Sequence, residues 1–411
     1  MLIHDYLIVG SGPVGFHVFN QIKEKVILIT GKTQKKIISK KIHPKIRLEL
    51  ERNTNKFADL IYSKKNNFYI YSSSEIGGFT NYWGRQFFDY KINEFWPKEF
   101  FKTYDQYKKN ISKINELYPS IQSKIIKTIN LGNLKINQLS PPLLKSPIVK
   151  KSKLKNKKDK FIIEDRVKSF KKIKKSLVEV KTEKKIFYCK KLILCAGPVG
   201  NSFILLRSFK NINSLKFRDD NPRMIFGIKT NKKNYLIKES DKMLDFDIFK
   251  SGKLNTYSTI YNIDPNHFNA FFKPIVKFFR SFLTKFFFYG QFWVKGEFNE
   301  IKINRDKDEI FLTGKNKNFN SQRINLINSL DKIGLKVFKI LKLKFAYGFH
   351  YHSLRVNYKG KNETINNFLK NMKLNKEVLC FDSSIIKKIS LKPPTKTFLA
   401  TANYLVKKFK S

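Results

Sequence analysis

The stretch that decides the fold is MLIHDYLIVGSGPVGFHVFNQIKEKVILIT, residues 1–30. Residues 5–9 have the pattern of a short buried strand, residues 13–23 have the spacing of a helix, and residues 26–29 have the pattern of a second strand. A strand, a helix and a second strand in this order form a βαβ unit, in which the helix joins two parallel strands. The opening residues therefore predict an α/β fold with a mainly parallel sheet.

The turn between the first strand and the helix is Gly10-Ser11-Gly12-Pro13-Val14-Gly15. A glycine-rich turn in this position is typical of dinucleotide binding. Gly10 makes the turn, Gly12 lets backbone approach a pyrophosphate, and Gly15 permits close packing of the helix, which opens at Pro13 and directs its positive end at the ligand. On these residues alone, a tight turn without a ligand remains the alternative.

The second strand ends at Thr30, where a dinucleotide-binding chain commonly has an acidic residue for the ribose. A threonine hydroxyl still bonds a ribose oxygen, without the added strength of a charged partner. Lys32, Lys35 and Lys36 follow, and they leave a phosphorylated ribose, as in NADP, as a less favoured alternative.

The composition is strongly basic, with 83 Lys+Arg against 32 Asp+Glu in 411 residues and a formal net charge of +51. The excess lysine is spread along the whole chain and no nucleic-acid motif collects it, so we expect no specific nucleic-acid partner. The absence of an uncharged apolar run of about 18 residues excludes a multi-span membrane protein. Cys189, Cys195 and Cys380 are too few for a disulfide framework or a zinc site, which favours a reducing cytoplasm.

The remaining pattern predicts two domains, one of them discontinuous. Residues 161–195 alternate as a meander of strands, and 141–160 are expected to be a solvated loop. The further helices are expected at 98–129, 200–209, 267–286, 321–340 and 395–409. We expect a first domain of residues 1–230 and 346–411, closed by the last helix, and a second domain of residues 231–345.

Four further segments identify a family resemblance. EIGGFTNYWG (75–84) resembles the GGxSxxWG stretch of the glucose-methanol-choline (GMC) flavoprotein oxidoreductases, and FWPKEFFKTYDQY (95–107) resembles the segment that follows it in that family. LILCAGPVGNSFILLRS (192–208) resembles the family's strand-AG-turn-helix segment, and residues 379–408 resemble its C-terminal DxSxxP stretch and closing helix. These segments occur in the family's order.

The resemblance implies an α/β fold with a Rossmann-like FAD-binding domain and a smaller α+β substrate domain. It implies noncovalently bound FAD and an alcohol dehydrogenase-like oxidoreductase that transfers hydride from a CH-OH group to flavin N5. The substrate would be a small alcohol, sugar or polyol, whereas the electron acceptor is not specified. A flavoprotein scaffold without catalytic activity is the alternative.

The resemblance also assigns cofactor contacts. The residues implied beyond the first turn are Gly77, Gly78, Thr80, Asn81, Trp83, Val167, Ala196, Gly197, Asp382 and Ser384. Glycine at 77 and 78 lets backbone N–H groups face a ligand, and Asn81 offers both a donor and an acceptor to the flavin edge. Trp83 and Val167 are equally consistent with core positions. Asp382 resembles the aspartate beside the pyrophosphate and ribityl chain.

Two histidines lie in the segment that resembles the family's catalytic stretch, FHYHSLRV, residues 349–356. An imidazole suits proton acceptance because its ordinary pKa is about 6.5. The ungapped register makes His350 the proton acceptor and His352 a neighbour on the same strand face, whereas a one-gap register exchanges them. Pro393 occupies the place of a second family His or Asn, and its side chain offers no hydrogen bond.

Residues 267–293, HFNAFFKPIVKFFRSFLTKFFFYGQFW, contain many phenylalanines and no acidic residue. Lys273, Lys277 and Arg280 have the spacing of one helical face, with aromatic residues around the rest. This pattern predicts a helix at 267–286 in the interface of an anionic membrane. A helix buried under the second domain is the alternative. We therefore expect a cytoplasmic protein, with peripheral attachment to the inner face of the membrane as a further expectation.

Overall fold

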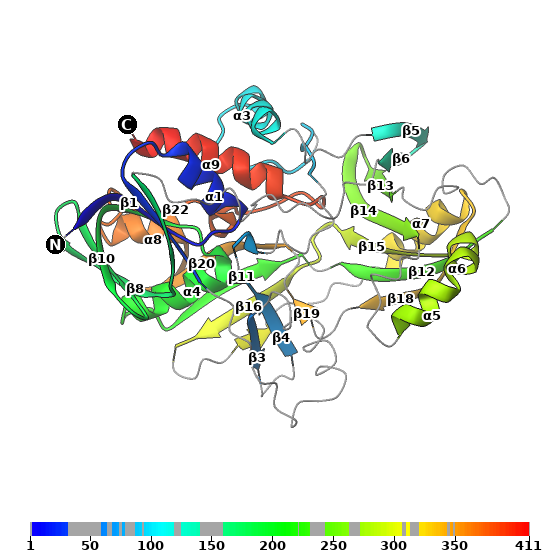
Figure 1. Ribbon diagram of the computed structural model, residues 1–411. Coiled ribbons are helices and arrows are strands. Elements are labelled where there is room, and N and C mark those ends of the chain that lie inside the picture. Colours follow the sequence, from blue (N-terminus) through cyan, green and yellow to red (C-terminus); the bar gives the residue numbers. More distant parts are fainter. Residues whose placement is uncertain are drawn as a thin grey trace.

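The glycine turn joins β1 (Ile3–Val9) to α1 (Pro13–Gln21) in the computed structural model, and β2 (Val26–Thr30) follows (Figure 1). β1 and β2 are parallel, with Tyr6 opposite Val26, as the sequence predicts for a βαβ unit. The structure describes residues 2–31, 59–63, 68–73, 76–78, 87–92, 94–118, 125–139, 159–220, 222–230, 243–262, 272–305, 310–312, 320–342, 346–347 and 350–410.

The first sheet is mainly parallel and brings together segments from both ends of the chain. Its strand order is β7-β2-β1-β10-β9-β8, and β22 also pairs with β10. The bounds are β7 Lys160–Glu164, β8 Val167–Lys174, β9 Leu177–Thr182, β10 Ile186–Leu194 and β22 Val378–Cys380. β10 runs parallel to β1 and β22, whereas β8 and β9 are antiparallel additions. This confirms the predicted fold class.

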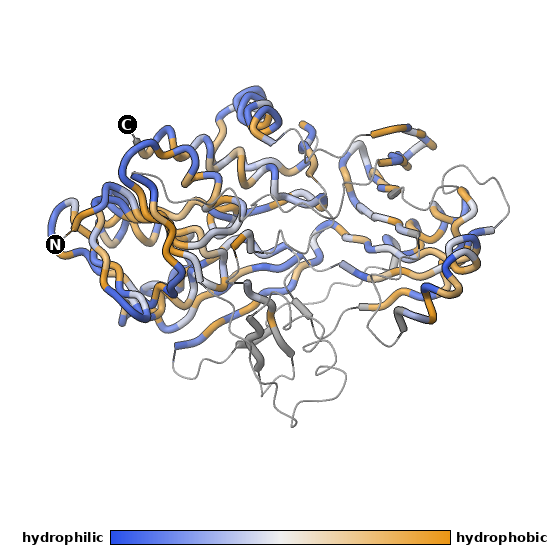
Figure 2. The backbone as a smooth tube through the Cα atoms, in the orientation of Figure 1, coloured by the Kyte–Doolittle hydropathy of each residue, from blue (hydrophilic) through white to orange (hydrophobic). Residues whose placement is uncertain are grey.

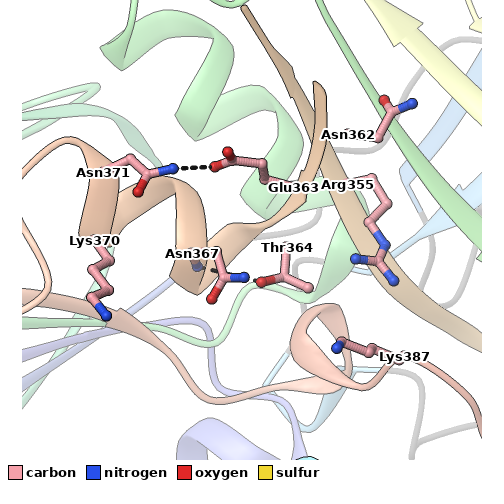
Figure 3. Close-up of a pocket in the computed structure, with 8 residues that line it drawn as sticks. All are labelled: Arg355, Asn362, Glu363, Thr364, Asn367, Lys370, Asn371 and Lys387. Carbon is pink, nitrogen blue, oxygen red and sulfur yellow. Dashed lines mark hydrogen bonds between the residues drawn. The ribbon is translucent and has the colours of Figure 1, made fainter. Parts of the chain in front are cut away.

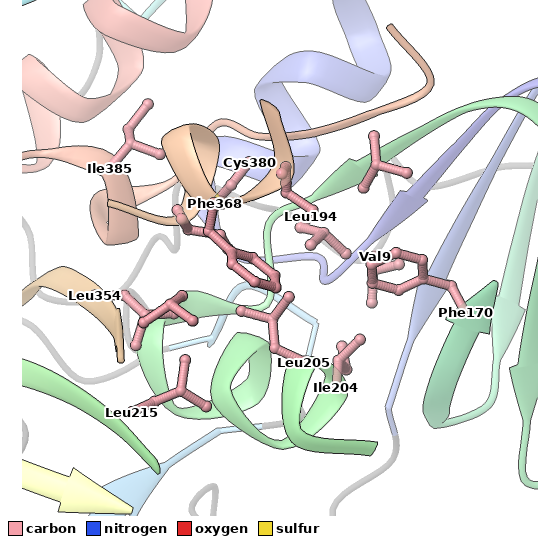
Figure 4. Packing of buried hydrophobic residues seen from close by; sticks show 14 of the residues in the cluster. Val9, Phe170, Leu194, Ile204, Leu205, Leu215, Leu354, Phe368, Cys380 and Ile385 are labelled. Carbon is pink, nitrogen blue, oxygen red and sulfur yellow. The ribbon is translucent and has the colours of Figure 1, made fainter. Parts of the chain in front are cut away.

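Helices cover both faces of this sheet. They are α3 Tyr104–Leu117, α4 Gly197–Ser208, α8 Ile365–Asn371 and α9 Thr395–Lys410. α9 packs against α1 and α3 (Figure 1). Leu7 and Val9 of β1 enter one core and Tyr6 and Ile8 enter the other, which explains why the second half of β1 has no charged residue (Figure 2). Figure 4 shows the first core, where Phe368 of α8 lies close to Leu205 of α4.

The second large sheet is antiparallel, with the strand order β18-β12-β15-β14-β13-β6-β5. The bounds are β5 Ile125–Leu131, β6 Leu134–Leu139, β12 Arg223–Lys229, β13 Met243–Lys250, β14 Lys253–Asn262, β15 Phe287–Val294 and β18 Leu335–Lys342. α7 (Asn320–Asp331) adds Leu326 and Leu330 to the core on one face. α5 (Phe272–Phe278) and α6 (Arg280–Phe286) contribute Val276 and Leu283 to a smaller cluster with Tyr289.

A third sheet, ordered β17-β16-β11-β20-β21, lies between these two parts of the molecule (Figure 1). The bounds are β11 Ser214–Asp219, β16 Asn299–Asn304, β17 Ile310–Leu312, β20 Tyr351–Tyr358 and β21 Lys361–Thr364. A small sheet contains β3 Asp59–Ser63, β4 Phe68–Ser72 and β19 Ala346–Tyr347. A 3₁₀ turn, Ser383–Ile385, follows β22.

The sheets do not follow the sequence ranges expected for the two domains. β5, β6 and β12 belong to one sheet with strands of the range 231–345, whereas β16 of that range pairs with β11. The domain boundaries stay a prediction. The expected loop at 141–160 lies outside the described residues except for its last two positions.

Two helical expectations were too long. The segment 98–129 contains α3, but it ends in β5, which pairs with β6. In the segment 321–340, α7 stops at Asp331, and the positive φ of Gly334, 80°, turns the chain into β18. The alternation that follows Leu335 then pairs with β12, so tertiary pairing overrides the helical spacing.

Gly15→Ala is expected to destabilise the protein, because a Cβ at this position would lie 1.9 Å from the carbonyl oxygen of Gly10. Overpacking of this kind costs about 1–3 kcal/mol, and more where backbone must move. The measurement is the free energy of unfolding in urea. The matched control is Gly12→Ala, where a Cβ meets nothing within 4 Å and stability should stay within about 1 kcal/mol of the parent. Equal losses in both variants would contradict the close-packing argument.

Candidate functional site

Three glycine-containing segments meet at the first turn. Gly10 has φ 99°, and a Cβ there would lie 2.4 Å from the carbonyl oxygen of Cys195, so the β1–α1 turn packs directly on the β10–α4 turn. The backbone N–H of Gly77 donates to the carbonyl of Ser11 at 2.9 Å, and a Cβ on Gly78 would lie 3.4 Å from the Cα of Gly12. The structure thus brings predicted glycines of the first two segments together with the β10–α4 turn.

The same place is open on one side. A Cβ added to Gly12 or to Gly197 would meet no atom of the described residues within 4 Å. Gly12 is the N-cap of α1, with Pro13 at the first helical position, and Ala196 is the N-cap of α4. Two helix N-termini therefore border free space lined by glycine, which is the arrangement that receives phosphate groups.

Asp382 and Ser384 lie at the second of these helix ends. The Asp382 carboxylate accepts from the backbone N–H of Gly197 at 2.6 Å and from that of Ser384 at 2.8 Å. The Asn201 side chain donates to Asp382 at 2.9 Å and to the Ser384 hydroxyl at 3.0 Å. Burial raises the pKa of Asp382, while the hydrogen bonds of Ser384 and Gly197 oppose that shift. The carboxylate therefore fastens the end of β22 to the start of α4.

Asn201 was not found by sequence reasoning. It is fully buried, and its side-chain oxygen accepts from the backbone N–H of Ala196 at 3.3 Å. Its position one helical turn after Gly197 in AGPVGN was the available signal. The partners that reveal its role lie far away in the sequence.

The other cofactor positions differ in what they contact. The buried hydroxyl of Thr30 lies 2.5 Å from the hydroxyl of Ser11, so a protein partner already engages it. Val167 is half-buried at the start of β8, opposite Thr182. The remaining predicted contacts, Thr80, Asn81 and Trp83, lie outside the described residues.

The two predicted catalytic histidines occupy the junction of the third and second sheets. β20 begins at Tyr351, so His350 lies immediately before the strand rather than on one face with His352, a correction to the expected arrangement. The backbone N–H of His350 donates to Asp219 at 2.8 Å, and its ring stacks on Trp293 of β15 with centroids 5.5 Å apart and planes at 10°. His350 is thus oriented by both sheets.

The hydrogen bonds define the state of the imidazoles. His352 Nδ1 lies 3.0 Å from the carbonyl oxygen of His350. A carbonyl only accepts, so Nδ1 carries the proton and Nε2 is the acceptor of His352. His350 Nδ1 is buried without a hydrogen-bond partner among the described residues. Burial, together with His352, lowers the pKa of His350 to about 3, and burial lowers the pKa of His352 to about 4. Both are neutral at neutral pH.

A buried charged cluster lies along the stacked rings from His350. Trp293 stacks on Tyr257, with centroids 5.6 Å apart, and the Lys392 ammonium lies 5.7 Å from the Tyr257 ring. Lys392 Nζ is 2.8 Å from Asp247 and 3.6 Å from Glu94. Burial by itself would lower the pKa of Lys392, but the neighbouring carboxylates, Asp247 first, raise it above its ordinary value. Lys392 directly precedes Pro393, and sequence reasoning missed it.

Unpaired polar atoms collect beside this cluster on β13 and β14. Asp245 Oδ1, Asp247 Oδ1, the Tyr257 hydroxyl and Thr259 Oγ1 are buried and have no hydrogen-bond partner within the described part of the chain. Tyr257 lies opposite Asp247, and Thr259 opposite Asp245, so the four belong to neighbouring positions of one sheet. Burial raises the pKa of Asp245 to about 7. Buried polar atoms of this kind require a ligand or water.

A separate polar recess of about 350 Å³ lies between β20, β21 and α8 (Figure 3). Asn371 donates to Glu363 at 2.6 Å across it, and the Thr364 hydroxyl caps α8 through the backbone N–H of Asn367. Its lining includes Arg355 of β20 but none of the predicted site residues. The recess therefore stands apart from the glycine turns and the histidines.

The chain folds as an α/β protein with a mainly parallel, Rossmann-like sheet and additional antiparallel sheets. This arrangement is similar to the crystal structure of pyridoxine 4-oxidase from Mesorbium loti, with a TM-score of 0.58, 12% identity and 99% of each chain covered. At this identity the likeness concerns the fold. No protein-family model and no curated protein matches the sequence.

The pH dependence of stability should change in opposite directions in two variants. His352 has a depressed pKa, so below about pH 6.5 the unfolded chain binds more protons than the native chain and stability falls as the pH falls. Between about pH 7 and pH 5 the parent protein loses free energy of unfolding, and His352→Gln should make that loss smaller by roughly 1–2 kcal/mol. Asp245 has a raised pKa, which stabilises the native state as the pH falls.

Asp245→Asn should therefore increase the loss of unfolding free energy between about pH 7 and pH 5, by a similar rough amount. The measurement for both variants is urea unfolding at the two pH values, with each variant's difference compared with that of the parent. If both variants leave the dependence of the unfolding free energy on pH unchanged, the pKa shifts assigned to His352 and Asp245 are wrong.

Proposed function

We propose that this protein is an FAD-dependent oxidoreductase that oxidises an alcohol group, with a sugar, polyol or related CH-OH donor as substrate. The observation that carries the proposal is the neutral, buried imidazole of His350, whose Nδ1 lacks a partner among the described residues. The GMC resemblance and the shared fold with pyridoxine 4-oxidase support it.

The residues of the glycine turns fit FAD. The open side of Gly12 and Gly197 is a cradle that a side chain would fill, and two helix N-termini border it. Gly12, Gly78 and Gly197 would hold the pyrophosphate through backbone, and Asp382 would hold the α4 end in place. FAD, when bound, supplies the acceptor for the hydride that leaves the carbinol carbon.

The protein's part in the reaction is to receive and orient a proton. His350 would accept the proton of the substrate hydroxyl, because a neutral imidazole nitrogen without a partner is an available acceptor. Asp219 fixes the backbone of His350, and Trp293 fixes the plane of its ring. His352, with its Nδ1 proton on the His350 carbonyl, has Nε2 available to orient the substrate.

The unpaired polar atoms of β13 and β14 favour a substrate with several hydroxyl groups. Asp245 and Asp247 offer acceptors, and the Tyr257 and Thr259 hydroxyls both donate and accept. A monohydric alkane alcohol would leave most of these atoms unpaired, at a cost in free energy for each. Lys392 keeps the Asp247 charge compensated in this buried region.

A non-catalytic FAD-binding scaffold is the second candidate. Two observations favour it: the Thr30 hydroxyl is engaged by Ser11 at 2.5 Å, and Pro393 is buried without a side chain that could hydrogen-bond a substrate. The two candidates differ in one measurable property. Only the enzyme reduces its flavin when mixed anaerobically with an alcohol substrate.

Gly12→Val should abolish flavin retention while the chain stays folded. The valine side chain would enter the open space beside the α1 N-terminus, where a Cβ meets no protein atom within 4 Å. The measurement is the flavin absorbance of the protein after gel filtration, with circular dichroism as the test of folding. Lys127→Val, on the exposed strand β5, is the matched control and should keep its flavin. A folded Gly12→Val protein that stays fully yellow would contradict the FAD assignment.

His350→Asn should bind FAD as the parent does but reduce it at least about 100-fold more slowly, because the proton acceptor is gone. The measurement is anaerobic bleaching of the flavin by a panel of polyols and sugars. His4→Gln, another buried histidine, in β1, is the control and should leave the rate unchanged. If His352→Gln alone causes the loss, the two roles exchange. If neither histidine affects a measurable rate, catalysis by this pair is wrong.

A further inference from the structure

The short helices α5 and α6 lie at an edge of the molecule (Figure 1), and five apolar side chains of this segment are exposed to solvent. The exposed fractions are Ile275 49%, Phe278 84%, Phe279 50%, Phe282 57% and Phe286 38%, and these five residues are called the α5–α6 surface. The rings of Phe278 and Phe279 lie 4.9 Å apart, as do those of Phe282 and Phe286. Grouped exposed aromatic residues mark an interaction site rather than ordinary surface.

The helices are anchored to the second sheet by a different set of side chains. Val276 and Leu283 pack in a cluster with Tyr289 of β15. The Lys229 ammonium of β12 donates to the carbonyl of Thr284 near the end of α6. Val276, Leu283 and Lys229 therefore hold the two helices against the second sheet, and the residues of the α5–α6 surface are not part of these contacts. This excludes the alternative in which the whole segment is buried under the second domain.

The charged residues within this segment of the chain all have the same sign. Lys277, Arg280 and Lys285 are exposed between and beside the phenylalanines, and the Lys285 ammonium lies 5.3 Å from the ring centroid of Phe286. Residues 265–296 contain no Asp or Glu. The helix is interrupted at Phe279, between α5 and α6. The sequence spacing predicted that the basic residues share one continuous helical face, and this interruption shows that they do not. They are divided between the two helices, Lys277 in α5 and Arg280 and Lys285 in α6.

We propose that the α5–α6 surface docks on an anionic lipid bilayer. Phenylalanine rings at the headgroup boundary and cations at the lipid phosphates match the two layers of such a surface. A second copy of the chain fits poorly, because it would bring two cationic segments together on molecules of net charge +51. No helix among the described residues is long and apolar enough to cross a membrane.

The test is co-sedimentation of the full-length protein with vesicles of phosphatidylcholine and phosphatidylglycerol. Salt is set at about 0.05 M and about 0.5 M, because salt screens charge but not ring insertion. The parent should bind at low salt and keep part of its binding at high salt. Phe278→Glu with Phe282→Glu should weaken binding about 10-fold or more at low salt and abolish it at high salt.

The control is Ile125→Glu with Ile126→Glu, which changes the charge equally at exposed apolar positions of β5, 57% and 52% exposed. This pair should bind like the parent, and thermal unfolding should show that both variants are folded. Equal weakening in the two pairs would overturn the proposal in favour of distributed charge. Absence of vesicle binding, with self-association that the Phe278 and Phe282 changes abolish, would overturn it in favour of a second copy.

Discussion

The contact between two backbone turns is the constraint on which the rest of the structure depends. Gly10 leaves no room for a side chain between β1 and the carbonyl of Cys195, and Cys195 N–H in turn donates to the carbonyl of Val9 at 2.8 Å. This contact places the N-termini of α1 and α4 beside one another. Asp382 then fastens the C-terminal part of the chain to the same point through Gly197. The candidate cofactor cradle is a consequence of this backbone packing.

A second constraint positions the histidines. β11 supplies Asp219 to the backbone of His350, and β15 supplies Trp293 to its ring. These two strands belong to different sheets, so the orientation of the His350 imidazole depends on how the two sheets are placed relative to each other. The stacked series from His350 through Trp293 and Tyr257 continues to the Lys392 ammonium. The His350 imidazole, which we propose as the proton acceptor, and the Lys392 ammonium therefore contact the same row of stacked aromatic rings.

Sequence reasoning found the features that are local in the chain. The strand–turn–helix at residues 1–30 follows from a short pattern and was predicted. It missed Asn201, because Asp382 and Ser384, which give it a role, are more than 180 residues away. It also extended α7 into β18, because the pairing with β12 is not visible in the local spacing. Both the role of Asn201 and the strand conformation of β18 depend on partners that are distant in the sequence, which a local pattern does not reveal.

The parallel sheet also has a consequence for the order in which the protein can assemble during synthesis. β1 must wait for β10, since Ile3 pairs with Tyr188, and β10 must wait for β22, since Leu192 pairs with Val378. Contacts of such high sequence separation make folding slow. Until almost the whole chain has left the ribosome, β10 exposes an unpaired edge to solvent. An unpaired strand edge is a site where other chains can pair, so the nascent chain carries an aggregation hazard through most of its translation.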